Sequence, residues 1–272
     1  MTVKVVNSLI ENCFAVIEYL AAEARSMRLS EIADRLGLPR SGAHRLLGAL
    51  YGLGWVEQDP DTEFYRLTLK LSVMGHRFLA GTHMLEICQP VLDRVAESCR
   101  ELVRLAVVEN AELVTIAHAQ GAQGSLICQS RVFPTLPLHV TASGKAWLAT
   151  LTNEKALELV LAAGLGAVDA FGPNAVRSVE AVIRELDRTR ERGYGLAVEE
   201  AEPGVTAVAV TICPGRGEAM GVLAIVGPAM RMSDARVAEM ARIAQAGAEE
   251  LGMLWPLRSL TRTAIPHPKA VA

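Results

Sequence analysis

The sequence predicts a mixed α+β protein of two parts: a small helical N-terminal part and a larger part with an antiparallel sheet flanked by helices. Three observations predict this class. The first 70 residues hold three short segments with helical apolar periodicity, followed by two β-like runs. From about Glu86 the composition shifts to apolar β-rich runs interleaved with amphipathic helices. A length of 272 residues is comfortable for two domains.

Two predicted helices cover residues 8–24 and 30–36, with Ser30 as the candidate N-cap of the second. Gly37 ends that helix, and Pro39 suits the first turn of the next. The third helix has a stripe of apolar residues at the spacing of a buried face, made of Ala43, Leu46, Leu47 and Leu50.

The run "WVEQDPDTEFYRL" has two β-like segments around a turn cluster and predicts a hairpin. Three helices followed by a hairpin make a winged helix-turn-helix. "TLKLSVMGHRFLAG" then predicts a connector helix. We therefore expect a winged helix-turn-helix domain at 6–70, a linker helix at 71–84, a second domain at 85–255 and a flexible tail at 256–272.

The second domain mixes predicted strands and helices in an order typical of an antiparallel α+β fold. The predicted strands are "LVRLAVVE", "ELVTIAHA", "SLICQSRV", "VTAVAVTIC" and "GVLAIVG". The predicted helices are "ASGKAWLATL", "SVEAVIRELDRTRERG" ended by Gly193, and "SDARVAEMARIAQAGAEELGML" capped by Ser233.

The third helix carries a polar face opposite its apolar stripe, with Ser41, Arg45 and Gly48 on it and His44 at its edge. A helix-turn-helix places its second helix in the DNA major groove, where Arg can bind guanine or phosphate. The alternative is an ordinary solvated face, since helix–Gly–helix patterns are common. The near-neutral charge of residues 1–71, with 8 basic and 9 acidic side chains, also weakens the DNA interpretation. The flanking helix and hairpin favour DNA. The residues expected at the duplex are Ser30, Arg40, Ser41, Gly42, His44, Arg45, Gly48 and Arg66.

The stretch "LSEIADRLGLPRSGAHRLLGALYGLGWVEQD…FYRLTLKLSVMG" resembles the N-terminal domain of IclR-type bacterial transcriptional regulators. Downstream, "PLHVTASGKAWLATL" and "RERGYGLAVEEAEPGVTAVAVTI" are similar to the effector-binding domain of that family, over roughly 6–255 in all. The resemblance implies a GAF-like ligand domain behind the winged helix, and homodimers or dimers of dimers on near-palindromic operator DNA. One departure is Gly42, where the family commonly has a hydroxyl residue.

A ligand site is expected around Thr141–Gly144, which precede a helix. The free N–H groups of a helix start suit an anion such as a small organic carboxylate, although a capped helix without ligand is an equal alternative. The resemblance adds Ala142, Ser143, Val198, Ala207, Ala224 and Val226 as pocket residues. Because these are mostly apolar, an aromatic or apolar carboxylate is expected. Phe133 is close in sequence and able to pack on a ring. The expected effector residues are Phe133, Thr141, Ala142, Ser143, Gly144, Val198, Ala207, Ala224 and Val226.

The sequence does not match the common enzymatic motifs. "TASGKA" has His139 and Ala146 where a phosphate-binding loop needs Gly and Ser or Thr, and no nucleophile elbow occurs. The histidines show no metal-ligand spacing. We expect no catalysis, cofactor or metal. The second hypothesis is a GAF-type small-molecule-binding or enzymatic module without operator specificity.

The bulk composition indicates a cytoplasmic protein with no membrane contact. The N-terminus lacks the apolar stretch of a signal peptide, and no apolar run reaches the ~18 residues of a membrane span. The five cysteines form no C-x-x-C and are expected as free thiols. A formal net charge of −3 requires any DNA-binding face to be local.

Overall fold

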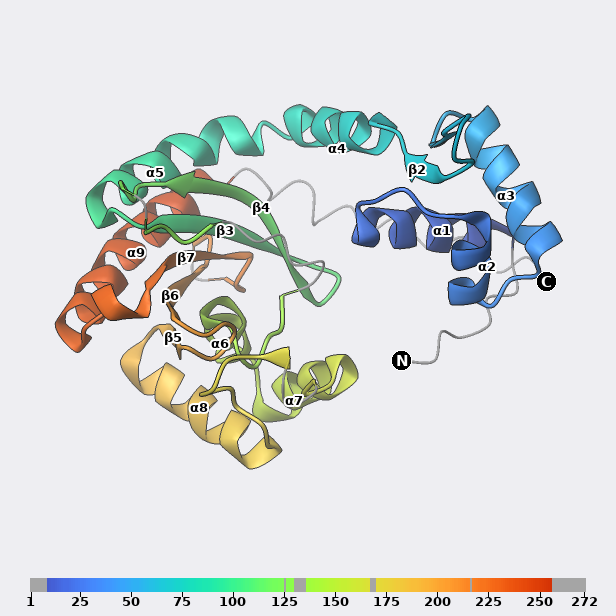
Figure 1. Ribbon diagram of the computed structural model, residues 1–272. Helices are drawn as coiled ribbons and strands as arrows, with labels where there is room; N and C mark the ends of the chain where they lie inside the picture. The colour runs from blue at the N-terminus through green and yellow to red at the C-terminus, as the bar shows by residue number, and fades with distance from the viewer. Residues whose placement is uncertain (1–8, 125, 130–135, 167–169, 216, 256–272) are drawn as a thin grey trace, which may run out of the picture. The chain divides into compact units, whose positions relative to one another are not determined.

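The computed structural model describes residues 9–124, 126–129, 136–166, 170–215 and 217–255. The chain forms two compact units, which meet between Gly81 and Thr82 along the sequence. Each unit has its own hydrophobic core. Figure 1 shows the helices and strands of each unit.

The first unit contains three helices, a short hairpin and a fourth helix. The elements are α1 (Leu9–Glu23), α2 (Leu29–Leu36), α3 (Arg40–Gly52), β1 (Val56–Gln58), β2 (Tyr65–Leu67) and α4 (Lys70–Gly81). The strands β1 and β2 pair antiparallel. The predicted stripe of α3 is buried, and Leu47 and Leu50 pack with Val16, Leu20 and Ile32 of the other helices. A winged helix-turn-helix is the result.

The helix α2 starts at Leu29, and its N-cap lies two residues before the predicted cap Ser30. Its N-cap is Arg28, so Ser30 lies inside the first turn and its N-cap assignment is wrong. Glu31 at the third helical position accepts a hydrogen bond from the Arg28 backbone N–H at 2.9 Å. That bond satisfies the backbone N–H of the N-cap residue and is the glutamate half of a capping box. The other end is as predicted, with Gly37 in the left-handed conformation at φ 64°.

The second unit is built on one antiparallel sheet with the strand order β4-β3-β7-β6-β5 among the described residues. Its strands are β3 (Leu102–Glu109), β4 (Glu112–Gln120), β5 (Gly195–Val198), β6 (Val205–Ile212) and β7 (Gly221–Pro228). Its helices are α5 (Met84–Cys99), α6 (Ala142–Leu148), α7 (Asn153–Ala163), α8 (Val179–Arg192) and α9 (Asp234–Leu254).

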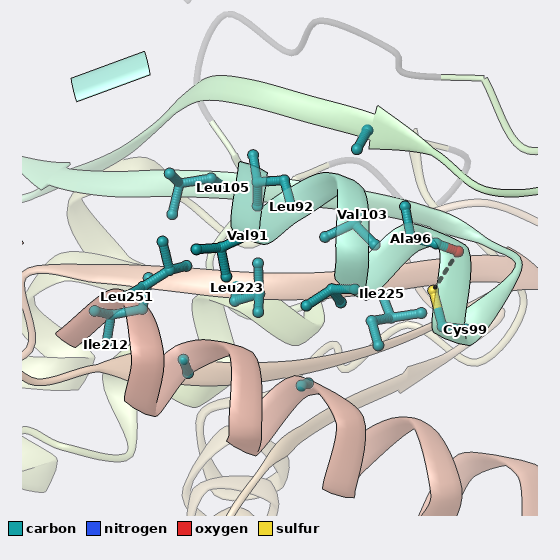
Figure 2. Packing of buried hydrophobic residues seen from close by; sticks show 14 of the residues in the cluster. Val91, Leu92, Ala96, Cys99, Val103, Leu105, Ile212, Leu223, Ile225 and Leu251 are labelled. Carbon is teal, nitrogen blue, oxygen red and sulfur yellow. Dashed lines mark hydrogen bonds between the residues drawn. The ribbon is translucent and has the colours of Figure 1, made fainter. Parts of the chain in front are cut away.

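Helices cover both faces of this sheet. The helices α5 and α9 pack on one face, where Val103 and Leu105 of β3 lie against Val91 and Leu92 of α5 (Figure 2). The opposite face packs against α6, α7 and α8 through a second cluster that includes Trp147. Side chains alternate between the two faces along each central strand, as the period of a strand requires.

The short helix α6 lies against the backbone of β5. A Cβ added at Gly195 would lie 2.1 Å from the Ala142 carbonyl oxygen and 2.8 Å from the Ala146 nitrogen. On the other side, a Cβ at Gly144 would lie 2.2 Å from the Leu138 carbonyl oxygen. These close approaches require glycine and hold the start of α6 against the sheet.

The sequence prediction missed α5 and α7 and placed one strand wrongly. Leu126–Gln129, the described part of the predicted strand "SLICQSRV", are irregular. Their carbonyl groups accept hydrogen bonds from side chains instead of from a neighbouring strand: Leu126 from Arg231, Cys128 from Gln120 and Gln129 from Arg104. These three carbonyl groups are therefore satisfied without a strand.

Candidate functional site

The helix α3 exposes its polar face. Ser41, His44, Arg45 and Gly48 are all exposed, opposite the buried stripe. A Cβ at Gly48 would meet nothing within 4 Å, so the space beside this position of the helix is open. The four residues share a helix side that contributes nothing to the core.

The remaining residues expected at DNA also belong to the first unit. Arg40 is exposed at the start of α3, and Gly42 and Ser30 are half-buried. Arg66 on β2 is exposed, and its Nε lies 2.6 Å from Glu57 Oε1 on the paired strand. The guanidinium of Arg66 therefore already has a carboxylate partner, although exposed pairs of this kind are weak.

A cavity of about 430 Å³ lies in the second unit, on the side of the sheet that faces α6. Its walls come from the strands, the start of α6, the 126–129 segment and the loop after β5. The lining residues are Arg104, Ala106, Thr115, Leu126, Ile127, Cys128, Gln129, Leu136, Thr141, Ala142, Ser143, Ala197, Ala201, Glu202, Gly204, Val205, Ala207, Ala224, Val226 and Pro228.

Most of the expected effector residues meet at this cavity. Thr141, Ala142, Ser143, Ala207, Ala224 and Val226 all line it. Val198 does not, because successive residues of β5 point to opposite faces and Ala197 takes the cavity side. Gly144 is buried beneath the wall, against Leu138. Phe133 lies outside the described residues.

The start of α6 is capped from within the chain. Thr141 Oγ1 accepts a hydrogen bond from the Gly144 N–H at 3.1 Å and donates to the Pro137 carbonyl oxygen at 2.8 Å. Thr141 is therefore the N-cap of α6. The Gly144 N–H is thus occupied by Thr141, although the sequence predicted that the N–H groups of this helix start could bind a carboxylate.

Sequence reasoning missed Arg104, the basic side chain in the cavity wall. Its Nη2 donates to the Gln129 carbonyl oxygen at 3.0 Å. Burial lowers the pKa of Arg104, and the nearby Glu202 carboxylate raises it. A usable signal existed, because an arginine in the otherwise apolar run "LVRLAVV" is unusual for a buried strand.

A buried ionic cluster lies beside the cavity. Lys145, whose side chain is 1% exposed, donates to the Leu196 carbonyl oxygen at 2.9 Å, and its Nζ lies 3.3 Å from Glu185 Oε1. The Lys145 ammonium also donates to Glu200, which follows β5. Glu185 is paired in turn with Arg192 at 2.6 Å. Burial raises the pKa of Glu200, while the Lys145 charge lowers it.

Two family profiles match the chain. The profile described as "IclR helix-turn-helix domain" matches residues 9–60, and "Bacterial transcriptional regulator IclR C-terminal" matches residues 76–253. The chain belongs to the IclR family.

Named relatives of this IclR-family chain are transcriptional repressors. The acetate operon repressor of Salmonella typhimurium is 30% identical over 88% of this chain and 87% of its own length. The transcriptional repressor IclR of Escherichia coli is 29% identical with the same coverage. The chain is thus a DNA-binding transcriptional regulator, and the family argues against the enzymatic alternative.

Solved structures agree on the fold of IclR-family proteins. An IclR homolog from Microbacterium hydrocarbonoxydans, complexed with 4-hydroxybenzoate, is 27% identical with a TM-score of 0.69 and covers 89% of this chain and 98% of its own. A regulator from Alicyclobacillus acidocaldarius has a TM-score of 0.77 at 23% identity, covering 90% and 98%. Within the described residues, no helix is long and apolar enough to cross a membrane, and no cluster of potential metal ligands occurs.

Proposed function

We propose that this IclR-family chain binds an operator of defined sequence through α3 and responds to a small organic effector in the cavity of the second unit. The observation that carries the proposal is the exposed polar face of α3, directly opposite a stripe that builds the core. Because the apolar stripe packs in the core, the polar face of α3 points away from the core and is open to DNA. We further propose that the genes it controls form a catabolic operon.

The DNA contacts come mainly from one side of α3. Arg45 is suited to a bidentate contact with guanine or to a phosphate, and Ser41, one turn earlier, to either. Arg40, Gly42, His44 and Gly48 extend this surface, with Ser30 and Arg66 at its margin. Gly42 carries no hydroxyl group, so the half-site it reads differs from that of relatives with one.

The effector is a small aromatic or apolar carboxylate. Much of the cavity wall is apolar, including Ala106, Leu136, Ala197 and Val226, which suits a ring better than a short polar acid. About 430 Å³ is within the ordinary range for small-molecule sites. A relative of the same fold carries 4-hydroxybenzoate, an aromatic carboxylate.

The active form is a homodimer or a dimer of dimers. One recognition helix reads only a few base pairs, so useful specificity needs two half-sites and a symmetric pair of chains. Along and just before α4, the exposed apolar residues Leu69, Val73 and Phe78 supply a surface for the second copy. No residue of α4 is buried within its own unit.

A gel-shift titration with the DNA upstream of its own gene tests this function. We expect a discrete complex that survives an excess of unrelated DNA and moderate salt. The second candidate, a small-molecule module without operator specificity, predicts only salt-sensitive shifts that unrelated DNA abolishes.

A further inference from the structure

Arg104 is placed where a buried strand normally has an apolar residue. It pairs with Ala224 of β7 and His118 of β4 near the centre of the sheet. Its neighbours Val103 and Leu105 point into the α5 and α9 cluster, so Arg104 lies on the cavity side, as its place in the lining requires. A cation at such a position loses hydration and needs an anionic or polar partner.

The hydrogen bonds of Arg104 are incomplete. Among the described residues, Nη2 binds the Gln129 carbonyl oxygen, and Nε is buried without any acceptor. Arginine stays protonated at neutral pH, so this is a charged donor left unsatisfied in a cavity wall. Such a group favours any ligand that brings an acceptor to it.

Support of the 126–129 segment does not account for Arg104. That segment is already tied by Gln120 Nε2 to the Cys128 carbonyl oxygen at 2.9 Å and by Arg231 to the Leu126 carbonyl oxygen at 2.9 Å. The Gln129 bond uses one N–H of Arg104 and leaves Nε unexplained. A hydrogen-bond acceptor on a bound ligand explains both why Arg104 lies in the cavity wall and why its Nε has no acceptor within the described residues.

We propose that Arg104 is the specificity-determining residue of the cavity and binds the carboxylate of the effector through Nε and a neighbouring N–H. This inference rests on the proposed ligand response. The planar guanidinium fork matches a carboxylate in geometry and charge. The apolar wall formed by Ala197, Ala207 and Val226 then receives the rest of the molecule. A neutral analogue of the same shape leaves Nε unpaired and binds more weakly.

Matched acids and amides test this assignment on the full chain. The probes are benzoate, 4-hydroxybenzoate and phenylacetate against their primary amides, measured by thermal shift and calorimetry. We expect at least one acid to raise the melting temperature while its amide does not. Arg104→Gln should weaken binding of that acid by at least about 30-fold, the loss expected when one partner of a buried charged pair is removed.

Two further variants serve as controls. Arg100→Gln removes an exposed arginine of the same unit and should bind the acid as the wild type does. Arg104→Lys keeps the charge but loses the fork, so it should fall between wild type and Arg104→Gln, and it decides the matter if Arg104→Gln does not fold.

Three results would overturn the assignment: amides that bind as well as acids, an Arg104 variant within about threefold of wild type, or no binding of any acid. Operator binding is read separately by gel shift. If the wild type shows no specific operator binding, the proposed function is refuted. If the wild type binds the operator but gives any of those three results, only the role of Arg104 is refuted.

Discussion

Lys145 Nζ and Glu200 Oε1 lie 2.5 Å apart at a site from which solvent is almost excluded. The pair joins α6, whose start forms one cavity wall, to the loop after β5, which forms another. Ala142 and Ser143 lie three and two residues before Lys145, and Ala201 and Glu202 directly follow Glu200. The ion pair therefore fixes the spacing between these two walls.

Replacing Lys145 by Met should destabilise the second unit by about 3–5 kcal/mol, because Glu200 loses its buried counter-charge while Glu185 keeps Arg192. Equilibrium denaturation followed by tryptophan fluorescence measures the change in the free energy of unfolding. The double variant Lys145→Met, Glu200→Leu should be more stable than the single one, because it removes a carboxylate along with the ammonium. Equal stability of the two variants would show that the pair carries no coupling.

Stability should fall on mild acidification because of His139. Burial lowers the pKa of His139 below its ordinary value, against a weaker opposing hydrogen bond with Leu165, and its ring packs edge-on against Phe171. The unfolded state therefore takes up this proton first. The contribution of His139 is complete above about pH 6.5, the unfolded value, and is lost as the pH falls toward the lower folded value.

Melting temperatures of wild type and His139→Asn between pH 7.5 and 5 test this pH dependence. We expect the variant to be less stable at pH 7.5 and to lose less stability than the wild type on acidification. Parallel pH profiles for the two proteins would rule out His139 as a source of the acid sensitivity.

The connector helix should control assembly. Changing both Val73 and Phe78 to Ser removes exposed apolar surface from α4 without touching a core, since both side chains are exposed. Light scattering should give a dimer or tetramer for the wild type and a shift toward monomer for the variant. The matched change Leu161→Ser, at an exposed leucine of α7, should leave the mass unchanged. A monomeric wild type would contradict the proposed pairing.

The local signals in the sequence predicted much of this structure. Gly37, Ser233 and the Leu46–Leu47–Leu50 stripe act within one or two helical turns, so their effect is visible in the sequence. The helix α5 contains Pro90, a residue that usually marks a helix end, and it was missed.

The features that the sequence did not reveal depend on residues far apart along the chain. Leu126–Gln129 are held by side chains from Arg104, Gln120 and Arg231 rather than by a strand. The pairing of β5 with β6 decides which residues of β5 face the cavity. Ala197 lines the cavity, whereas the expected Val198 does not. An arginine in an apolar run is visible in the sequence, but the side of the sheet that Arg104 takes depends on the pairing of β3 with β4 and β7.

Operator affinity of the Arg45 variants tests the central claim most directly. Fluorescence anisotropy with the upstream operator, at several salt concentrations, compares wild type, Arg45→Ala and Arg45→Lys. Arg45 is exposed opposite the buried stripe, so neither change should disturb the core. We expect Arg45→Ala to lose about 1–3 kcal/mol of binding free energy, with Arg45→Lys recovering it only if Arg45 binds phosphate rather than guanine. An operator affinity unchanged by Arg45→Ala would contradict the assignment of α3 as the helix that reads DNA.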